Sequence, residues 1–201
     1  MKKLIALLLL ICLMPLCAWA ETAACSDVVI PMEGAEVVFT PVKNSHLLTR
    51  ESTEEEFEQL GQEYWDLIPW MDQYDVYALL FDADMTTEFQ IIATETNKPS
   101  IEELTEAQEK RLFEERQYYY SGYHYTVTSA EFYQSPEGHK YIRVVAYYPL
   151  NGRKVYSVEY FTRYAGYEVS VFLLPYEDEV IQEHWDMAQA LADSLRIRAV
   201  E

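Results

Sequence analysis

The sequence predicts an α+β fold in which helices cover an antiparallel β-sheet. Apolar and polar residues alternate over four consecutive stretches in the second half of the chain, which is typical of an antiparallel meander. Two earlier segments combine helical spacing of apolar residues with a capping-box motif, and a third amphipathic segment closes the chain. Of the 201 residues, 50% are hydrophobic and 24% charged, the balance of a globular protein.

The N-terminal twenty residues have the layout of a secretory signal peptide. Two lysines precede an apolar run over residues 4–16, and Ala18 and Ala20 stand at the positions that a signal peptidase reads. We therefore expect cleavage before Glu21 and an exported, extracytoplasmic protein. A membrane anchor is the alternative, but the run is short for a span and no positive charges follow it.

The cysteines allow no internal disulfide after cleavage. Cys12 and Cys17 fall in the signal segment, which leaves Cys25 alone. Its preceding residues partly resemble a lipoprotein processing site, so Cys25 is either lipidated or a free thiol near the terminus. No linker, repeat or second membrane-spanning segment interrupts residues 21–201, which predicts a single domain.

The first half of this domain predicts two strand pairs and two helical stretches. We expect strands at 28–31, 36–40, 76–82 and 88–95, and helices from Ser52-x-x-Glu55 to about Pro69 and from Ser100-x-x-Glu103 to about Ser121. Gly61 is expected to split the first helical stretch, and Gly122 to end the second in the left-handed conformation.

The second half predicts the meander and a closing helix. Strands are expected at 123–134, 140–148, 155–163 and 167–174. Asn151-Gly152 is the strongest turn signal between them, because both residues accept a positive φ. The acidic residues 177–179 are expected to begin the last helix at its positive end.

Three stretches carry a resemblance to a known family: residues 28–50, the meander ending at 169–173 and the closing helix ending at 192–197. On these, the chain resembles the PsbP-like and DcrB-like α/β/α sandwich domains of secreted bacterial proteins and lipoproteins. Residues 57–61, followed by a second short helix and a strand at 76–79, resemble a branch of these domains with no assigned activity. The resemblance implies an accessory, binding or assembly role and supplies no catalytic residues.

Composition and motifs exclude several functions. A formal net charge of −19 opposes binding to nucleic acid or anionic lipid. The four histidines lack the spacing of a zinc site, and the chain contains neither a Gly-x-Ser-x-Gly elbow nor a phosphate-binding loop. Asp82 and Asp84 alternate as Ca²⁺ ligands do, but a polar hairpin tip is the simpler interpretation. We therefore predict a non-enzymatic protein without metal or cofactor; a hydrolase that uses scattered carboxylates is one alternative.

The aromatic content is the unusual feature, with 17 Tyr, 4 Trp and 8 Phe. Tyrosines gather in the second half of the chain, including the run Tyr118–Tyr120. On the predicted strand at 140–148, Tyr141, Arg143 and Tyr147 share one face. Tyr, Trp and Arg are typical interface anchors, so these three are the candidate contact site for an unidentified extracytoplasmic partner protein.

Two other interpretations of the tyrosines stay open. A helix, such as the one expected from residue 101 to 121, would make Tyr141 and Tyr147 core residues if it covered their face. The tyrosines would alternatively stack on a small ligand or a polysaccharide.

Overall fold

The computed structural model describes residues 26–200, so the expected signal segment and Cys25 lie outside the described residues. The elements are β1 (Val28–Met32), β2 (Ala35–Phe39), β3 (His46–Thr49), α2 (Glu54–Gln59), α3 (Tyr64–Gln73), β4 (Val76–Phe81), β5 (Thr87–Glu95), the 3-10 turn η1 (Ile101–Glu103), α4 (Glu106–Gly122), β6 (Thr126–Gln134), β7 (Lys140–Leu150), β8 (Arg153–Tyr164), β9 (Tyr167–Pro175), α5 (Gln182–Ser194) and β10 (Arg196–Ala199).

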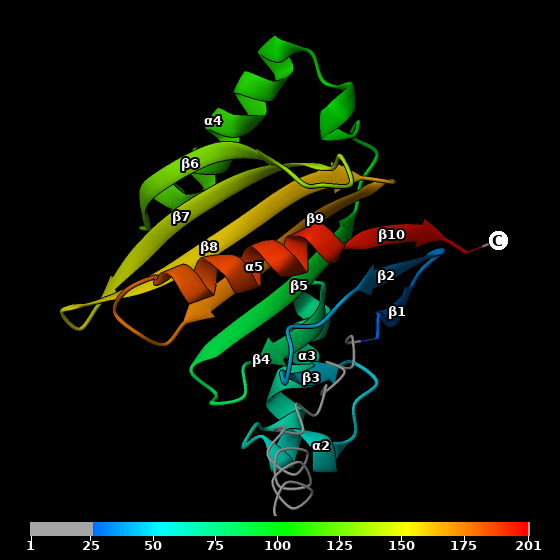
Figure 1. Cartoon of the computed structure of the whole chain (residues 1–201), viewed down its shortest axis with the longest axis vertical. Helices are drawn as coiled ribbons and strands as arrows, with labels where there is room; N and C mark the ends of the chain where they lie inside the picture. The colour runs from blue at the N-terminus through cyan, green and yellow to red at the C-terminus, as the bar shows by residue number, and fades with distance from the viewer. Residues whose placement is uncertain (1–25, 201) are drawn as a thin grey trace, which may run out of the picture.

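A seven-stranded antiparallel sheet forms the centre of the molecule, with the strand order β3-β4-β5-β9-β8-β7-β6 (Figure 1). The predicted meander is confirmed as β6 to β9. Both turn residues at Asn151-Gly152 have positive φ, 52° and 82°, as the hairpin prediction requires. The meander brings β9 back beside β5, which joins the two halves of the chain in one sheet.

A second, three-stranded sheet pairs the two ends of the described chain, in the order β1-β2-β10. Neither β10 nor β3 was predicted from the sequence, because four residues are too few to show a period. In β10, Ile197 is buried while Arg198 bonds outward to Glu36, at 3.1 Å between Nη2 and Oε2.

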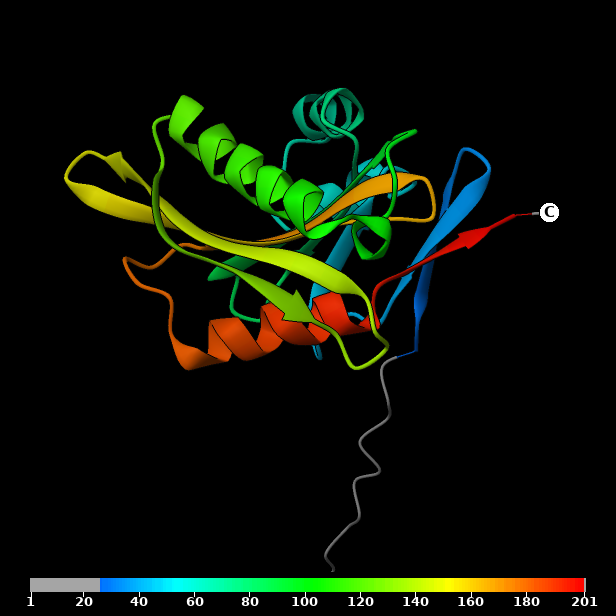
Figure 2. The same ribbon diagram turned by 90° about the horizontal axis from the view of Figure 1, so that it is seen from above.

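Helices cover both faces of the large sheet (Figure 2). On one face, α5 and the small sheet pack over one apolar cluster, which includes Phe89, Tyr160 and Leu191. On the other face, α4 with η1 covers β6 to β8, and α2 with α3 covers β3 and β4. The predicted α+β fold is confirmed, and the arrangement is an α/β/α sandwich.

One helix start and one helix end in the first half differ from the predictions. The capping box of α2 is formed by Thr53 and Glu56, because the Ser52 hydroxyl instead accepts the Thr49 N–H at 3.1 Å. Gly61, at φ 68°, separates α2 from α3 as predicted. Pro69 lies inside α3 rather than at its end, since proline φ suits a helix and one lost hydrogen bond is outweighed by packing of residues such as Met71.

The later helices also begin further along the chain than predicted. The Ser100–Glu103 box caps only η1, because Leu104 is extended, and a new box at Thr105 begins α4. Gly122 stays inside α4, and His124 takes the left-handed conformation at φ 64° instead.

Candidate functional site

The face that carries Tyr141, Arg143 and Tyr147 is covered by α5, so the prediction of a free contact face is wrong at Tyr141. Tyr141 is 1% exposed, and its hydroxyl donates a 2.8 Å hydrogen bond to the Ala192 carbonyl of α5. Burial raises the pKa of this hydroxyl, which is the behaviour of a core residue. The covering helix is α5, not the 101–121 segment considered from the sequence.

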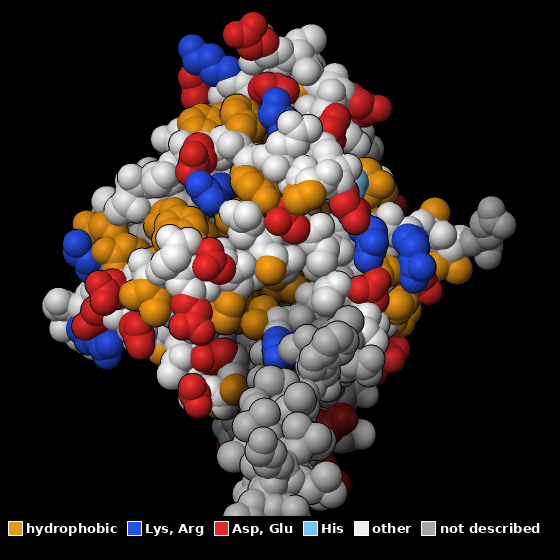
Figure 3. Space-filling model, viewed as in Figure 1, with side chains coloured by type: hydrophobic (Ala, Val, Ile, Leu, Met, Phe, Trp, Pro, Cys, Tyr) orange, Lys and Arg blue, Asp and Glu red, His pale blue; other side chains and the backbone are white. Residues whose placement is uncertain are grey.

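Arg143 and Tyr147 do not form one patch with Tyr141. Arg143 is half-buried and forms an ion pair with Glu131. Its guanidinium carbon lies 5.1 Å from the ring centroid of Trp185. Tyr147 is half-buried and packs 5.6 Å from Tyr156 between ring centroids. Figure 3 shows acidic side chains scattered among apolar ones on this side of the molecule.

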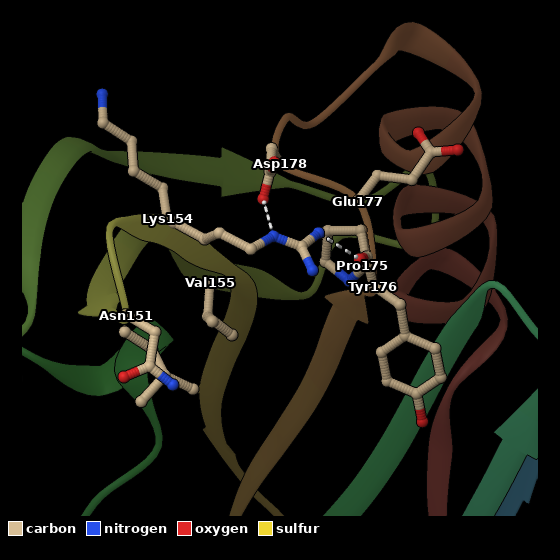
Figure 4. A pocket seen from close by; sticks show the side chains of 9 residues that line it. Asn151, Lys154, Val155, Pro175, Tyr176, Glu177 and Asp178 are labelled. Atoms are coloured by element: carbon tan, nitrogen blue, oxygen red, sulfur yellow. Dashed lines mark hydrogen bonds and ion pairs between the residues drawn. The ribbon is translucent and has the colours of Figure 1, made fainter.

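A hollow of about 250 Å³ lies between the β7–β8 hairpin and the segment after β9 (Figure 4). Arg153 lines this hollow, and its guanidinium bonds to Asp178, at 2.8 Å between Nε and Oδ1, and to the Tyr176 carbonyl. Asp178 belongs to the acidic residues 177–179, which were expected to begin the last helix. They lie before α5 instead, because α5 begins at Gln182. The Arg153 guanidinium is already paired within the chain.

The candidate site is a groove on the opposite face, where α3 and α4 lie apart over the sheet. We call it the α3–α4 groove. Its two adjoining hollows measure about 520 and 310 Å³. Its floor is formed by β5, β9 and β8, and its walls are mainly aromatic; the groove is lined by Trp70, Tyr74, Val76, Gln90, Ile92, Thr94, Arg116, Tyr119, Tyr120, Tyr123, Tyr125, Ser157, Phe161, Glu168, Ser170, Phe172 and Leu174.

A buried polar network holds the α4 wall on the sheet. Glu159 of β8 is 0% exposed and forms a two-point ion pair with Arg116 of α4. The same carboxylate accepts bonds from the Tyr120 hydroxyl at 2.9 Å and the Ser170 hydroxyl at 2.7 Å. The network satisfies a charge that would otherwise be costly to bury.

Aromatic rings enclose the Arg116 guanidinium. Its central carbon lies 4.8 Å from the Tyr119 ring centroid and 4.3 Å from that of Phe161. Burial lowers the pKa of Arg116, but the Glu159 carboxylate more than offsets this, and the net direction is upward. Burial and the same carboxylate raise the pKa of Tyr120 well above its ordinary value, so its hydroxyl stays neutral.

Glu168 closes the other end of the groove floor between two cations. Its Oε1 lies 2.9 Å from both Lys98 Nζ and Arg163 Nε. Partial burial alone raises the pKa of Glu168, but the bond from Lys98 and the charge of Arg163 lower it below 4.5 on balance.

The lowered pKa of Glu168 predicts a pH dependence of stability. A carboxylate whose pKa is lower in the folded than in the unfolded state stabilises the fold above its unfolded pKa, and this contribution is lost as the pH falls through the folded pKa. Wild type is expected to be more stable than Glu168→Gln at pH 7, and the difference should shrink below pH 4.5. Urea titrations of both proteins between pH 7 and pH 3 measure the difference in their free energies of unfolding. A difference that does not change with pH would contradict the lowered pKa of Glu168.

The tyrosine run at the end of α4 is visible in the sequence, but no site was predicted there, and Trp70 and Tyr74 were not among the predicted site residues. The only signal available was the density of tyrosines around Tyr119 and Tyr123. Nothing local links them to α3, because the pairing of β5 with β9 creates the groove floor.

The metal sites considered from the sequence are not assembled in residues 26–200. No group of three or more His, Cys, Asp or Glu in this part of the chain is arranged to hold a metal ion. The Asp82 carboxylate accepts bonds from the Thr86 and Thr87 amides at 2.7 and 2.8 Å, which makes it a turn residue of the β4–β5 hairpin. None of the helices in the same range combines the length and apolar character of a bilayer span.

The likeness that comparisons with known proteins give is one of structure. No protein-family model matches the sequence, and no curated protein matches it significantly. The fold is similar to the solution structure of cyanobacterial PsbP (CyanoP) from Synechocystis sp. PCC 6803, over 91% of this chain and 99% of that one, with 12% identity and a TM-score of 0.48. At this identity and score the likeness does not bear on what the chain binds.

Proposed function

We propose that this chain is an exported, non-enzymatic accessory protein that holds an extended segment of another extracytoplasmic protein in the α3–α4 groove. The observation that carries the proposal is a strip of sheet flanked by exposed aromatic side chains on two separate helices. Export is supported by the signal-like residues 1–20; lipidation of Cys25 is the alternative to a free secreted form.

The composition of the groove is that of a protein contact surface. Tyr74, at the C-terminal end of α3, and Tyr119 and Tyr123, on and after α4, are all exposed. Tyrosine buries a large area with few rotatable bonds, and Tyr, Trp and Arg dominate binding hot spots. The aromatic rims therefore provide anchors, and the sheet between them provides a floor.

The dimensions favour an extended segment. The floor follows β5 from Gln90 to Thr94 and continues beside Leu174 and Ser157 at one end. At about 3.3 Å per residue, this strip accommodates roughly five or six residues of extended chain. An open groove of this shape is less suited to enclosing a small ligand on all sides, which small-molecule sites do.

The charge of the chain indicates the chemistry of the partner. A net charge of −19 attracts basic partners and repels acidic ones. Aromatic faces also bind guanidinium and ammonium groups, as Tyr119 and Phe161 do with Arg116. We therefore propose a partner segment that combines basic and apolar side chains.

Peptide display tests the proposed function. Random heptapeptides are selected on the wild-type protein, and the enriched peptides are titrated against wild type and Tyr74→Ser/Tyr119→Ser. The selected peptides should be basic, and the double variant should bind them about a hundredfold more weakly, through loss of two anchors. Tyr118→Ser is the matched control, since Tyr118 neighbours Tyr119 but is 79% exposed and outside the groove.

Two results would overturn the proposal. One is a selection that yields no peptides, or peptides that bind the double variant as well as wild type. The other is binding of neutral oligosaccharides on a glycan array that the double variant abolishes, which would assign the groove to polysaccharide instead.

A further inference from the structure

One end of the α3–α4 groove is a pocket walled by tyrosines, with a volume of about 310 Å³. We call it the tyrosine pocket. It is lined by Gln90, Tyr119, Tyr120, Tyr123, Tyr125, Ser157, Phe172 and Leu174.

The four tyrosine rings form a connected set around this pocket. Tyr119 lies 4.9 Å from Tyr123 and 5.8 Å from Tyr120 between ring centroids, and Tyr120 lies 5.7 Å from Tyr125. Two of these contacts are edge-to-face, so neighbouring rings differ in orientation and more than one direction of the pocket is aromatic. Ring faces arranged in this way attract a cation through their quadrupoles.

The lining supplies no positive charge of its own: within the described chain, its residues include neither Lys nor Arg. Arg116, which packs against the Tyr119 ring of this lining, is neutralised by Glu159. Burial raises the pKa of Tyr119, Tyr120 and Tyr125, so the rings stay neutral at physiological pH.

Ser157 provides a second, independent indication of a ligand. Ser157 is 3% exposed, and its buried hydroxyl has no hydrogen-bond partner among the described residues. A buried hydroxyl without a partner is costly, and native proteins rarely leave one. An N–H donor entering the pocket would complete its bonding.

We infer that the tyrosine pocket takes the ammonium group of a lysine side chain from the partner segment. This inference rests on the proposed function. The rings attract the charge, the Ser157 hydroxyl accepts an N–H, and the net charge of −19 favours the approach of a cation. Lysine fits this role because its ammonium carries three N–H donors on a flexible apolar stem.

The test compares a charged probe with a neutral one of similar shape. Nα-acetyl-lysine methylamide and its Nε-acetylated form are titrated into the protein at pH 7, and the tyrosine ring signals are followed by NMR. The charged probe should bind about tenfold more tightly, since desolvated cation–π contacts reach this size. The shifts should fall on the tyrosine-pocket rings.

Three variants separate the contributions. Tyr123→Leu keeps an apolar side chain but removes a ring, and should weaken binding of the charged probe about fivefold. Ser157→Ala should weaken it by a similar factor without lowering the unfolding free energy, because the hydroxyl has no partner in the free protein. Tyr118→Leu, outside the pocket, should leave binding unchanged.

Equal binding of the two probes, or full affinity in Tyr123→Leu, would overturn the lysine assignment. That result is distinguishable from failure of the proposed function. Displayed peptides that depend on Tyr74 and Tyr119 but tolerate norleucine at every lysine would leave the groove a peptide site and refute only the pocket's preference. Binding of the charged probe, together with a selection that yields no peptides, would refute the peptide site and leave the pocket's preference for an ammonium group standing.

Discussion

Replacing Arg116 by methionine is expected to destabilise the protein by about 3–5 kcal/mol, the usual cost of leaving a buried charge without its partner. The variant leaves the Glu159 carboxylate without its cationic partner. This carboxylate is 0% exposed and keeps only the bonds from the Tyr120 and Ser170 hydroxyls. Methionine retains much of the apolar stem of arginine, so most of the loss should be electrostatic. Urea denaturation at pH 7 measures the free energy of unfolding.

A second arginine on α4 provides the matched control. Arg111 pairs with Glu115 at 2.8 Å, but both side chains are exposed. Exposed pairs contribute little, so Arg111→Met should lie within about 0.5 kcal/mol of wild type. The double variant Arg116→Met/Glu159→Gln removes both charges and should recover part of the loss. An Arg116→Met protein as stable as Arg111→Met would show that the network does not hold α4 on the sheet.

Tyr141→Ala is expected to cost about 3–5 kcal/mol, the range for removing a large aromatic side chain from a core. It leaves a cavity between β7 and α5, and the Ala192 carbonyl keeps only the Leu195 N–H, at 3.3 Å. Tyr141→Phe keeps the ring and should lose only about 1 kcal/mol, from the hydrogen bond. Thermal or urea unfolding of the two variants separates packing from hydrogen bonding.

Tyr147→Ala is the comparison on the same face of the same strand. Tyr147 is half-buried and packs on Tyr156 near the exposed hairpin, so its removal should cost about 1 kcal/mol. If Tyr141→Ala proved as mild as Tyr147→Ala, α5 would not cover this face, and the contact site predicted from the sequence would regain its support.

Tyr141 and Tyr147 show which property of a residue can be predicted from strand alternation and which cannot. Alternation placed Tyr141, Arg143 and Tyr147 correctly on one face, because the strand period of two is a local property. Whether that face is free depends on where α5 lies, and α5 reaches it from a distant part of the chain. The amphipathic pattern of α5 is visible in the sequence, but the face of the sheet on which α5 packs is not.

Helix starts show a similar limit on a smaller scale. Ser52 and Thr53 are both good cap residues, and each has a glutamate three positions later. The choice of Thr53 depends on Ser52 being engaged by the amide of Thr49, at the end of β3. A four-residue strand shows too little pattern to be predicted from the sequence. The choice between Ser52 and Thr53 depends on that strand, so it could not be predicted either.

The sequence by itself determined the local structure: the meander with its Asn151-Gly152 turn, the break at Gly61 and the helical segments that become α4 and α5. These depend on side-chain period and on backbone conformations that few residues accept, and both act over a few positions. Only the tertiary structure decided which faces are covered and that Tyr74 and Tyr119 stand on opposite walls of one groove. That placement follows from the pairing of β5 with β9 and from the anchoring of Arg116 on Glu159, contacts between segments far apart in the chain.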